Sequence, residues 1–436
     1  MTYPLGRDCM RVYIETYGCA LNKADTALMK SLLSASGHEI VQTIEDADVV
    51  IINTCTVRKD SEERILKRLS VLRNLNGKKL IVAGCMAAAQ PYTILKYVPN
   101  ASLLSPQNVT EVVSLIESSA PKYLVGGERD VSYLEPYLED RVATIPIAEG
   151  CLGDCAFCIV KIARRRLRSY RPGLIVRAVR KAIEQGALEI DLTAQDTGSY
   201  GIDLGNVRLP DLVRRVLDEV NGDYMIRIGM MNPDTILDVL DDLIEVLRDR
   251  RVFKYVHLPL QSGSDKVLRI MKRKYSVDEY REIVKELRSK VEGITVATDI
   301  IVGHPGEDDE DFEMTIGVVK ELMFDKVHIA QYTPRPRTEA AAMKQVPEGV
   351  KKARSTALAL LVEEIGIRQN SEYIGSLARV LVATRSFRGD ALGRTFNYRP
   401  VVIKEPRSFR GYGIVRIVGA TFFDLRGELE KKLDEA

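Results

Sequence analysis

The chain of 436 residues lacks the segments that direct proteins into or across membranes. Its first ten residues contain no apolar stretch of the kind found in signal peptides, so we expect no secretory leader. No apolar run elsewhere approaches the length that spans a bilayer. We therefore expect a cytoplasmic protein with no membrane partner.

An excess of charge of one sign is also missing. Sixty-three Lys and Arg residues stand against 61 Asp and Glu, which leaves a net charge of +2. The chain as a whole is therefore no polycation, and any binding to nucleic acid must come from local patches. With 45% hydrophobic and 28% charged residues, the composition is that of a globular protein, and the length indicates two or three domains.

A disulfide framework is absent too. The seven cysteines are an odd number, and their spacing favours reduced thiols that serve as ligands. The four histidines (His38, His257, His304 and His328) include no pair at zinc-site spacing. Structural zinc prefers four ligands, often in C-x2-C pairs, so a zinc-binding RNA adaptor without enzymatic activity is a weak alternative.

What the chain does have is a tight group of cysteines at Cys151, Cys155 and Cys158. Their spacing is C-x3-C-x2-C, and Phe157 precedes the last of them. Three thiolates on one short loop can hold three irons of a cubane cluster and leave the fourth iron without a protein ligand. That iron would be an open coordination site, so the cluster would be reactive and not only an electron carrier.

The segment 11–124 repeats one pattern, in which a β-branched run ends near a cysteine and an amphipathic stretch follows. The three cysteines are Cys19, Cys55 and Cys85. Such repeats predict βαβ units with a parallel sheet, whose carboxyl edge would carry all three thiols. We interpret them as a shared metal or cluster site; the alternative is three buried structural cysteines. Cys9 has no matching context.

The segment 141–369 alternates predicted strands and helices. The strands are expected at 143–148, 188–193, 224–229, 255–259, 294–300 and 327–332, and helices at 174–185, 210–220, 235–248 and 277–290. Six βα units indicate a partial barrel with its chemistry at the carboxyl ends of the strands. Polar or glycine-rich motifs follow five of these strands, and they include Gln195, Gln261 and Asp299.

The segment 371–436 consists of short β-branched runs between glycine and arginine turns, which predicts a small β-barrel. Between Ser371 and Ala420 its basic residues are Arg379, Arg385, Arg388, Arg394, Arg399, Lys404, Arg407, Arg410 and Arg416, interleaved with aromatic residues. Basic residues for phosphates and aromatic rings for stacking predict RNA binding, with a solvated basic face as the alternative. A second basic run, 161–171, suggests a polyanionic substrate near the cysteine loop, or else a helix face.

Taken together, these motifs resemble the radical S-adenosylmethionine (SAM) methylthiotransferases. The cysteine loop matches the C-x3-C-x-aromatic-C pattern of radical SAM enzymes, and the three preceding cysteines and the basic β-barrel extend the match. Stretches similar to the archaeal and eukaryotic branch that acts on tRNA are 15–22, 192–201, 227–233, 297–303, 333–338 and 393–400. The glycine-glycine-glutamate stretch common in radical SAM barrels is absent, and Gln195 and Asp196 stand there instead.

The resemblance implies an N-terminal parallel α/β domain (10–124), a central partial (β/α)6 radical SAM barrel (137–369) and a C-terminal TRAM-like β-barrel (371–434). Cys151, Cys155 and Cys158 would hold a [4Fe–4S] cluster that binds SAM and cleaves it to a 5′-deoxyadenosyl radical. Cys19, Cys55 and Cys85 would hold a second [4Fe–4S] cluster that carries the inserted sulfur. Phe157, through its backbone, Gln195, Gln261 and Asp299 would contact SAM.

The implied reaction adds a methylthio group at C2 of N6-threonylcarbamoyladenosine at position 37 of tRNA, in the anticodon loop. A radical is needed because that C–H bond is unactivated. The C-terminal barrel would hold the tRNA mainly through phosphates, with no DNA partner, and a ferredoxin or flavodoxin would donate electrons. Related enzymes that act on isopentenyladenosine in tRNA or on a ribosomal-protein aspartate are the alternatives. A second cluster that only relays electrons should have a fourth cysteine ligand, and only Cys9 is available for that role.

Overall fold

The computed structural model describes residues 9–57, 59–75, 77–385, 390–404 and 409–433, so Arg388 and Arg407 lie outside the described residues. The chain packs into two compact units. The first comprises the described part of Met1–Tyr137 with Glu149–Cys151 and Cys158–Tyr170; the second comprises Leu138–Ala148, Leu152–Phe157 and the rest from Arg171. The three-domain division at 10–124, 137–369 and 371–434 stays a prediction.

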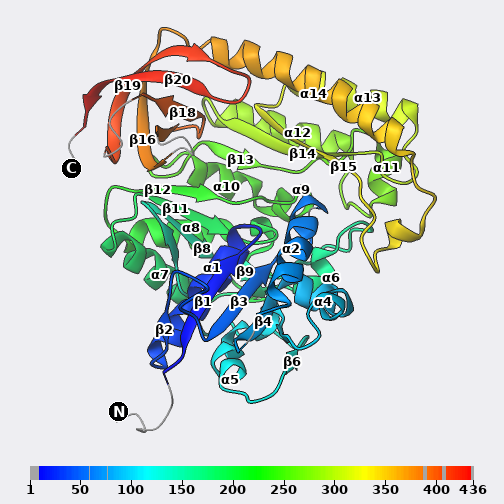
Figure 1. Ribbon diagram of the computed structural model, residues 1–436. Helices are drawn as coiled ribbons and strands as arrows, with labels where there is room; N and C mark the ends of the chain where they lie inside the picture. The colour runs from blue at the N-terminus through cyan, green and yellow to red at the C-terminus, as the bar shows by residue number, and fades with distance from the viewer. Residues whose placement is uncertain (1–8, 58, 76, 386–389, 405–408, 434–436) are drawn as a thin grey trace. The chain divides into compact units, whose positions relative to one another are not determined.

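The first unit contains a parallel six-stranded sheet in the order β2-β1-β3-β4-β5-β6 (Figure 1). Its strands are β1 (Arg11–Thr16), β2 (Glu39–Ile40), β3 (Val49–Thr54), β4 (Lys79–Gly84), β5 (Ser102–Leu104) and β6 (Tyr123–Leu124). All six residues of β3 are buried, as expected for a central parallel strand covered on both faces. The predicted parallel sheet is therefore confirmed.

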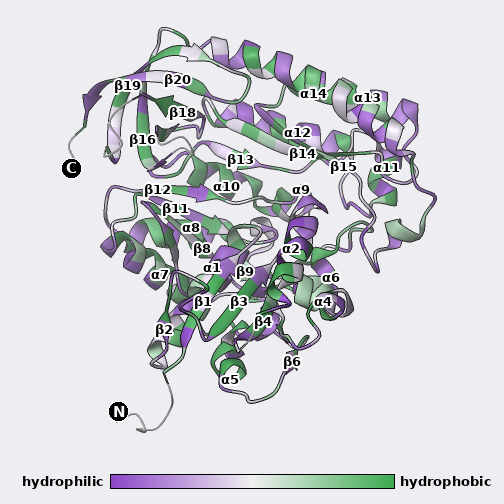
Figure 2. Cartoon of the chain, in the orientation of Figure 1, coloured by the Kyte–Doolittle hydropathy of each residue, from purple (hydrophilic) through white to green (hydrophobic). Residues whose placement is uncertain are grey.

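Helices cover both faces of this sheet. They are α1 (Ala20–Ala35), α2 (Lys59–Leu72), α3 (Cys85–Ala89), α4 (Pro91–Tyr97), η1 (Pro106–Glu111), α5 (Val112–Ile116) and α6 (Val160–Arg164). One core packs α1 and α5 against β1 and β3, through residues such as Leu28, Met29 and Leu115. A second core packs α2 and α4 around Val82, with Ile65, Leu69 and Ile94. Figure 2 shows the apolar strands between these helices.

The second unit contains six parallel strands in two sheets. They are β8 (Val142–Pro146), β11 (Glu189–Thr193), β12 (Met225–Ile228), β13 (Tyr255–His257), β14 (Thr295–Val302) and β15 (Lys326–Gln331). One sheet has the order β12-β11-β8, with β7 (Tyr137–Glu139) at its edge, and the other has the order β13-β14-β15. Phe253 N–H donates to Ile226 O (3.0 Å) and Met231 N–H to His257 O (2.9 Å), so backbone bonds connect the two sheets. The predicted partial barrel is confirmed.

The helices of this barrel are α7 (Pro172–Glu184), η2 (Thr197–Ser199), α8 (Leu209–Glu219), α9 (Pro233–Ile236), η3 (Leu237–Val239), α10 (Leu240–Leu247), α11 (Asp265–Ile270), α12 (Val277–Lys290), α13 (Asp309–Leu322), η4 (Glu339–Ala342) and α14 (Glu348–Ser371). The helix predicted over 235–248 is wrong as one element, because the chain breaks into α9, η3 and α10. Arg208 donates to the Thr235 carbonyl (2.9 Å) and pairs with Asp238, which holds the chain in the broken path.

The remainder of the second unit is a closed barrel in the order β16-β17-β18-β20-β19. Its strands are β16 (Leu377–Arg385), β17 (Ala391–Thr395), β18 (Pro400–Ile403), β19 (Gly411–Ala420) and β20 (Leu425–Lys432). Leu381, Ala383 and Tyr412 pack against Met225 and Phe253 of the larger barrel. The predicted small β-barrel is therefore confirmed, and it shares a core with the strands that precede it.

Several basic residues of this small barrel are not available to RNA, contrary to the count made from the sequence. Arg399 pairs with Asp325, Arg410 with Asp140, and Arg416 with Glu430 at 2.6 Å. A guanidinium paired with a carboxylate contributes little net charge to a phosphate site. The composition alone therefore overstated the positive charge that this barrel offers to RNA.

Two short strands, β9 (Ala148–Glu149) and β10 (Arg168–Ser169), flank the cysteine loop and α6. Across the described ranges, no helix combines the length and the apolar character needed to span a membrane.

Candidate active site

Cys19, Cys55 and Cys85 lie at the carboxyl edge of the first sheet. Strands β1, β3 and β4, which precede them, are parallel neighbours. Cys19 stands at the N-terminus of α1 and Cys85 opens α3. Both sulfur atoms lie near one amide, because Asn22 Oδ1 is 3.7 Å from Cys19 Sγ and 3.8 Å from Cys85 Sγ. The convergence expected from the strand pattern is what the structure shows.

Two glycines permit this close approach. Gly18 has φ +110°, and a Cβ there would lie 2.8 Å from Cys55 Cβ. Gly84 has φ +89°, and a Cβ there would lie 2.3 Å from Asn53 Oδ1. Larger residues are disfavoured at such φ values even without a clash. The turns before Cys19 and Cys85 therefore require glycine.

The electrostatics of Cys85 favour a bound cation. Burial raises the pKa of the Cys85 thiol to about 12; Arg164 opposes this shift, whereas Cys19 and Cys55 add to it. Three thiolates at this edge would repel one another unless positive charge bound between them. Soft thiolate sets select zinc, Cu(I) or iron–sulfur clusters, so the donor set fits the predicted cluster.

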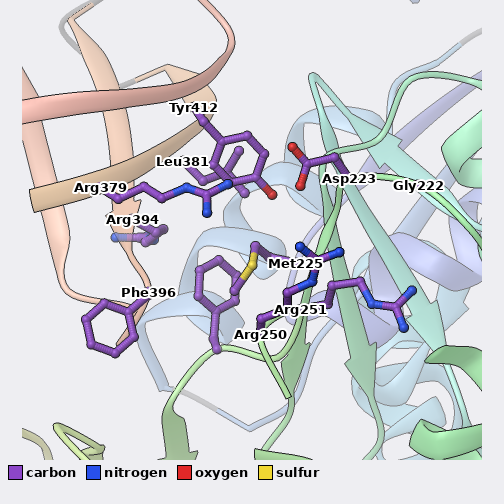
Figure 3. Close-up of a pocket in the computed structure, with 11 residues that line it drawn as sticks. Gly222, Asp223, Met225, Arg250, Arg251, Arg379, Leu381, Arg394, Phe396 and Tyr412 are labelled. Atoms are coloured by element: carbon purple, nitrogen blue, oxygen red, sulfur yellow. The ribbon is translucent and has the colours of Figure 1, made fainter. Parts of the chain in front are cut away.

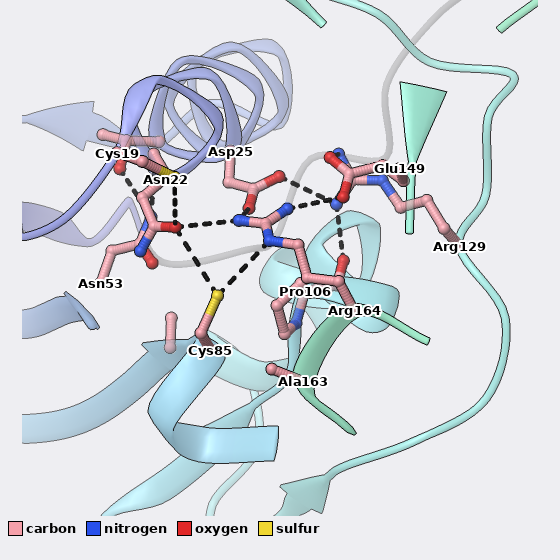
Figure 4. A network of polar contacts seen from close by, with 12 residues as sticks. Cys19, Asn22, Asp25, Asn53, Cys85, Pro106, Arg129, Glu149, Ala163 and Arg164 are labelled. Carbon is pink, nitrogen blue, oxygen red and sulfur yellow. Dashed lines mark hydrogen bonds and ion pairs between the residues drawn. The ribbon is translucent and has the colours of Figure 1, made fainter. Parts of the chain in front are cut away.

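Arg164 connects this edge to the segment that follows the cysteine loop (Figure 4). Its Nε donates to Cys85 Sγ at 3.4 Å, and its Nη2 donates to Asn22 Oδ1 (2.9 Å) and Asp25 Oδ2 (2.8 Å). Its Nη1 donates to Glu149 Oε2 at 2.6 Å. Arg164 is 3% exposed. The second basic run was predicted to attract a polyanion, and for Arg164 that interpretation is wrong because this side chain is buried and paired.

A second buried arginine completes the network. Arg129 Nη1 lies 2.9 Å from Asp25 Oδ1 and donates to Pro106 O at 2.5 Å. Its Nη2 lies 3.9 Å from Glu149 Oε1 and donates to the Tyr170 hydroxyl at 3.2 Å. Two guanidinium groups thus face two carboxylates. Such an arrangement tolerates burial because each charge has a partner.

The cysteine loop is divided between the two units. Cys151 and Cys158 belong to the first and Cys155 to the second. Cys151 N–H donates to Arg165 O at 3.2 Å. Gly150, with φ +75°, passes so close to the Arg166 carbonyl that a Cβ would lie 2.0 Å from its oxygen. All three thiols are partly exposed and reduced, as ligands for a metal must be.

In the second unit, Cys155 is held by Arg273. Arg273 Nη1 donates to Cys155 Sγ at 3.3 Å, and its Nη2 donates to Asn232 Oδ1 at 2.7 Å. Burial opposes the charged form of Arg273, but nearby Tyr275 and Cys155 leave its pKa above the ordinary value. The bond from Arg273 therefore fixes the position of the Cys155 sulfur beside Asn232.

Phe157 packs next to this position, with its ring edge-on to His304 at 6.0 Å between centroids. His304 in turn packs edge-on against Tyr332 at 5.1 Å. The preceding residue is clamped through its backbone, because Ala156 N–H donates to Met271 O (3.1 Å) and Ala156 O accepts from Ala340 N–H (3.0 Å). These contacts fix the backbone immediately before Phe157.

Gln195 and Gln261 offer polar atoms that nothing in the described residues uses. The Oε1 atom of each is buried and has no hydrogen-bond partner there. Gln261 has φ +68°, a strained value, and its backbone is held to β14 by bonds with Asp299 O (2.8 Å) and Ile301 N (3.0 Å). Unsatisfied acceptors on a strained backbone are typical of ligand sites, and the ammonium and ribose hydroxyls of SAM are matching donors.

Asp299 belongs to a polar cluster on β13, β14 and β15. Its Oδ1 lies 3.0 Å from His257 Nε2, and the His257 and His328 rings are 5.2 Å apart between centroids. One ligand atom from each of the three residues lies within 4.8 Å of the others, so the group has the donors to bind a metal or a polar substrate group. Figure 1 shows the three strands side by side.

Asp196, which follows Gln195, supports the barrel instead of facing a ligand. Its Oδ1 accepts from Asn232 N–H at 2.9 Å and its Oδ2 from Asn232 Nδ2 at 3.0 Å. Burial raises its pKa to about 6, and the bonds from Asn232 and Thr235 oppose that shift. Asp196 therefore ties the loop after β11 to the loop after β12.

Comparisons with known proteins show which family this chain is similar to. The model described as the Radical SAM superfamily matches residues 145–319, and that described as Uncharacterized protein family UPF0004 matches residues 11–105. A probable threonylcarbamoyladenosine tRNA methylthiotransferase of Methanocaldococcus jannaschii is 40% identical over 96% of this chain and 97% of its own. The threonylcarbamoyladenosine tRNA methylthiotransferase of Danio rerio is 36% identical over 86% of this chain and 70% of its own. The chain belongs to the threonylcarbamoyladenosine tRNA methylthiotransferase family.

Solved structures agree on the fold of this methylthiotransferase family member. A radical S-adenosylmethionine methyltransferase, TsrM, from Kitasatospora setae covers 77% of this chain and 74% of its own, with a TM-score of 0.57 and 13% identity. The cobalamin-dependent S-adenosylmethionine radical enzyme OxsB covers 81% of this chain and 56% of its own, with a TM-score of 0.54 and 11% identity. The predicted family is confirmed, and the protein is a transferase.

Sequence reasoning missed four polar residues of this methylthiotransferase. Asn22 and Arg129 had no pattern of their own, although Asn22 ends the stretch 15–22 that carried the resemblance. Arg164 was noted only as part of a basic run, and Arg273 was not noted at all. Each acts on a cysteine or on a cysteine's neighbour through contacts between segments far apart in sequence. A local pattern cannot reveal such pairs.

Proposed function

We propose that this protein adds a methylthio group to C2 of N6-threonylcarbamoyladenosine at position 37 of tRNA. One observation carries the proposal: three cysteines from three neighbouring strands gather at one sheet edge, in a chain that also has the C-x3-C-x2-C loop. Two separate sets of three thiols are what two clusters with open irons require. The family membership and the tRNA substrate named for the relatives support the choice of substrate.

Cys151, Cys155 and Cys158 are the proposed ligands of the SAM-binding [4Fe–4S] cluster, and Cys19, Cys55 and Cys85 those of the second. With SAM bound, the first cluster supplies a radical able to take hydrogen from the unactivated C2 position. The chain's own part is to hold the thiols and exclude water. Arg273 orients the sulfur atom of Cys155, and Arg164 and Asn22 orient those of Cys85 and Cys19.

SAM would lie in the barrel of the second unit. The free acceptors of Gln195 and Gln261 suit its ammonium and ribose hydroxyls, Asp299 adds a carboxylate nearby, and the clamped Phe157 backbone borders the site. Gln195 stands where the glycine-glycine-glutamate stretch of other radical SAM barrels would lie. Each contact orients the cofactor; none of these residues needs to transfer a proton.

tRNA is the proposed partner, with a ferredoxin or flavodoxin as electron donor and the cytoplasm as compartment. The three-part organisation 10–124, 137–369 and 371–434 would assign the second cluster, the radical chemistry and tRNA binding to successive segments. Phosphate contacts should dominate RNA affinity, so binding should weaken steeply with salt.

Metal analysis tests the cluster assignment. Anaerobically purified wild-type protein should contain about eight iron and eight acid-labile sulfide per chain, and the Cys151→Ala/Cys155→Ala/Cys158→Ala variant about four of each. About four iron in the wild type and none in the variant would mean that Cys19, Cys55 and Cys85 hold no cluster.

Nucleoside analysis tests the substrate. In a strain that lacks the gene, tRNA hydrolysates analysed by mass spectrometry should lose 2-methylthio-N6-threonylcarbamoyladenosine and accumulate its unthiolated precursor. Re-expression of the wild type should restore the product, whereas Cys55→Ala should not. An unchanged level of the product in the deletion strain would refute the substrate assignment.

A further inference from the structure

A cavity of about 320 Å³ lies where the larger barrel of the second unit meets the small C-terminal barrel (Figure 3). One wall is formed at the N-terminal ends of β12 and β13, and side chains of β16, β17 and β19 with Phe396 form the other. The residues of the first wall are Gly222, Asp223, Met225, Arg250, Arg251 and Phe253. The cavity is therefore at the N-terminal ends of the strands. Gln195, Gln261 and Asn232 follow the carboxyl ends, so the cavity is distinct from the proposed SAM site.

The lining is strongly basic. It holds four arginines, Arg250, Arg251, Arg379 and Arg394, and one carboxylate, Asp223; of these arginines, Arg251 pairs with Asp249 at 3.8 Å. In the described ranges, neither Arg250 nor Arg379 has a carboxylate at ion-pair distance, unlike the paired arginines elsewhere in the small barrel. Arg379 lies over the Tyr412 ring at 4.5 Å from its centroid, which holds the guanidinium toward the cavity.

Three aromatic residues, Phe253, Phe396 and Tyr412, also line the cavity. Tyr412 is only 4% exposed, and its hydroxyl lies beside Asp223. Phe396, at the rim, is 51% exposed and offers a ring face for stacking. Guanidinium groups beside a stacking ring are the combination that single-stranded RNA uses.

We propose that this cavity binds one phosphodiester of the tRNA, remote from the reacting adenosine, with the adjacent base stacked on Phe396. The inference rests on the proposed tRNA substrate. Asp223 favours a phosphodiester over a free nucleoside di- or triphosphate. A carboxylate beside the arginines would repel the second and third charges of a free nucleoside di- or triphosphate, whereas a phosphodiester carries only one.

The position of the cavity predicts which kinetic parameter depends on it. The five residues of β11 alone span about 17 Å, so RNA bound at the N-terminal ends of the strands cannot be the nucleotide at the carboxyl ends. Contacts there are the same in the ground state and the transition state. Their loss should raise KM for tRNA and leave kcat unchanged.

The test measures the affinity of the anaerobic holoenzyme for a full-length tRNA transcript over a series of salt concentrations. Arg250→Gln and Arg379→Gln should each weaken binding about fivefold to tenfold near 0.1 M salt and reduce the slope of log K against log salt by about one. Phe396→Ala should weaken binding about fivefold or more without changing the slope. Arg416→Gln is the matched control, since Arg416 lies on the same barrel but pairs with Glu430.

Wild-type affinity and slope in the Arg250→Gln/Arg379→Gln variant would overturn the proposal, as would an equal loss in Arg416→Gln. Adenosine monophosphate and inorganic phosphate serve as competitors. If either protects the wild type but not the double variant from thermal unfolding while tRNA affinity stays unchanged, the cavity is a free-phosphate site and the RNA assignment is wrong. Wild-type enzyme that binds no tRNA would instead refute the proposed function. If the wild type forms the product and the arginine variants bind tRNA as the wild type does, only the proposal for the cavity is refuted.

Discussion

Replacing Arg164 by leucine should destabilise the first unit by about 3 kcal/mol, because it leaves two buried carboxylates with too little positive charge. Arg164 bonds Asp25 at 2.8 Å and Glu149 at 2.6 Å, and both carboxylates are almost fully buried. Removal of one partner from a buried ion pair costs about 3–5 kcal/mol. Arg129 still contacts Asp25 at 2.9 Å, which places the expected loss at the lower end.

For a unit of this size, a loss of about 3 kcal/mol lowers the unfolding temperature by about 6–12 °C. Anaerobic calorimetry of the cluster-free protein measures this without any contribution from iron. Arg166→Leu is the matched control, because Arg166 belongs to the same basic run but is exposed, and it should change stability by less than about 0.5 kcal/mol.

A double variant tests the reason for the loss. Arg164→Leu/Glu149→Leu removes one carboxylate together with the guanidinium, so it should recover part of the stability that Arg164→Leu loses. If Arg164→Leu unfolds at the same temperature as Arg166→Leu, the buried network contributes no net stability. If replacing Glu149 as well lowers the stability further below that of Arg164→Leu, uncompensated charge is not the cause of the loss.

Three further changes test other parts of the structure. Cys55→Ala should still cleave SAM but form no methylthio product, whereas Cys151→Ala should do neither. Chromatography of 5′-deoxyadenosine and of the modified nucleoside measures the two activities. Methylthio product from Cys55→Ala would refute the role of the second cluster. Burial raises the pKa of Glu189 to about 7 from 4.5, so the folded state retains a proton that the unfolded state releases. Stability to urea should fall as pH rises from 4.5 to 7, and Glu189→Gln should reduce that slope, with buried Asp196 contributing the remainder. Gly84→Ala should cost roughly 2 kcal/mol or more and lower the iron content, since its Cβ would meet Asn53; a variant with wild-type stability would show that the turn can relax.

The strands were the most predictable part of the fold. The run of β3 favours a strand from its sequence alone, because five of its six residues are β-branched, and all six are buried. The six strands of the larger barrel were found within a few residues of their predicted positions. The helix over 235–248 failed, because the contact from Arg208 to the Thr235 carbonyl crosses 27 residues of sequence.

The basic segments show the opposite case. Arg164 and Arg399 look the same in sequence as Arg166 and Arg379, yet the first two are buried and paired. Whether an arginine meets a carboxylate depends on which segments pack together. The long-range partners Asp25 and Asp325 therefore decided which cations remain available to a substrate.

By itself, the sequence determined the spacing of the thiols and the succession of the strands along the chain. Thiol spacing along one loop and β-branched runs are local properties, and parallel strands bring their carboxyl ends to one edge whatever the rest of the chain does. Only the tertiary structure decided which side chains surround the thiols and which arginines face a cavity. Those outcomes depend on burial and on pairing between distant segments, where a charge is stable only beside its partner.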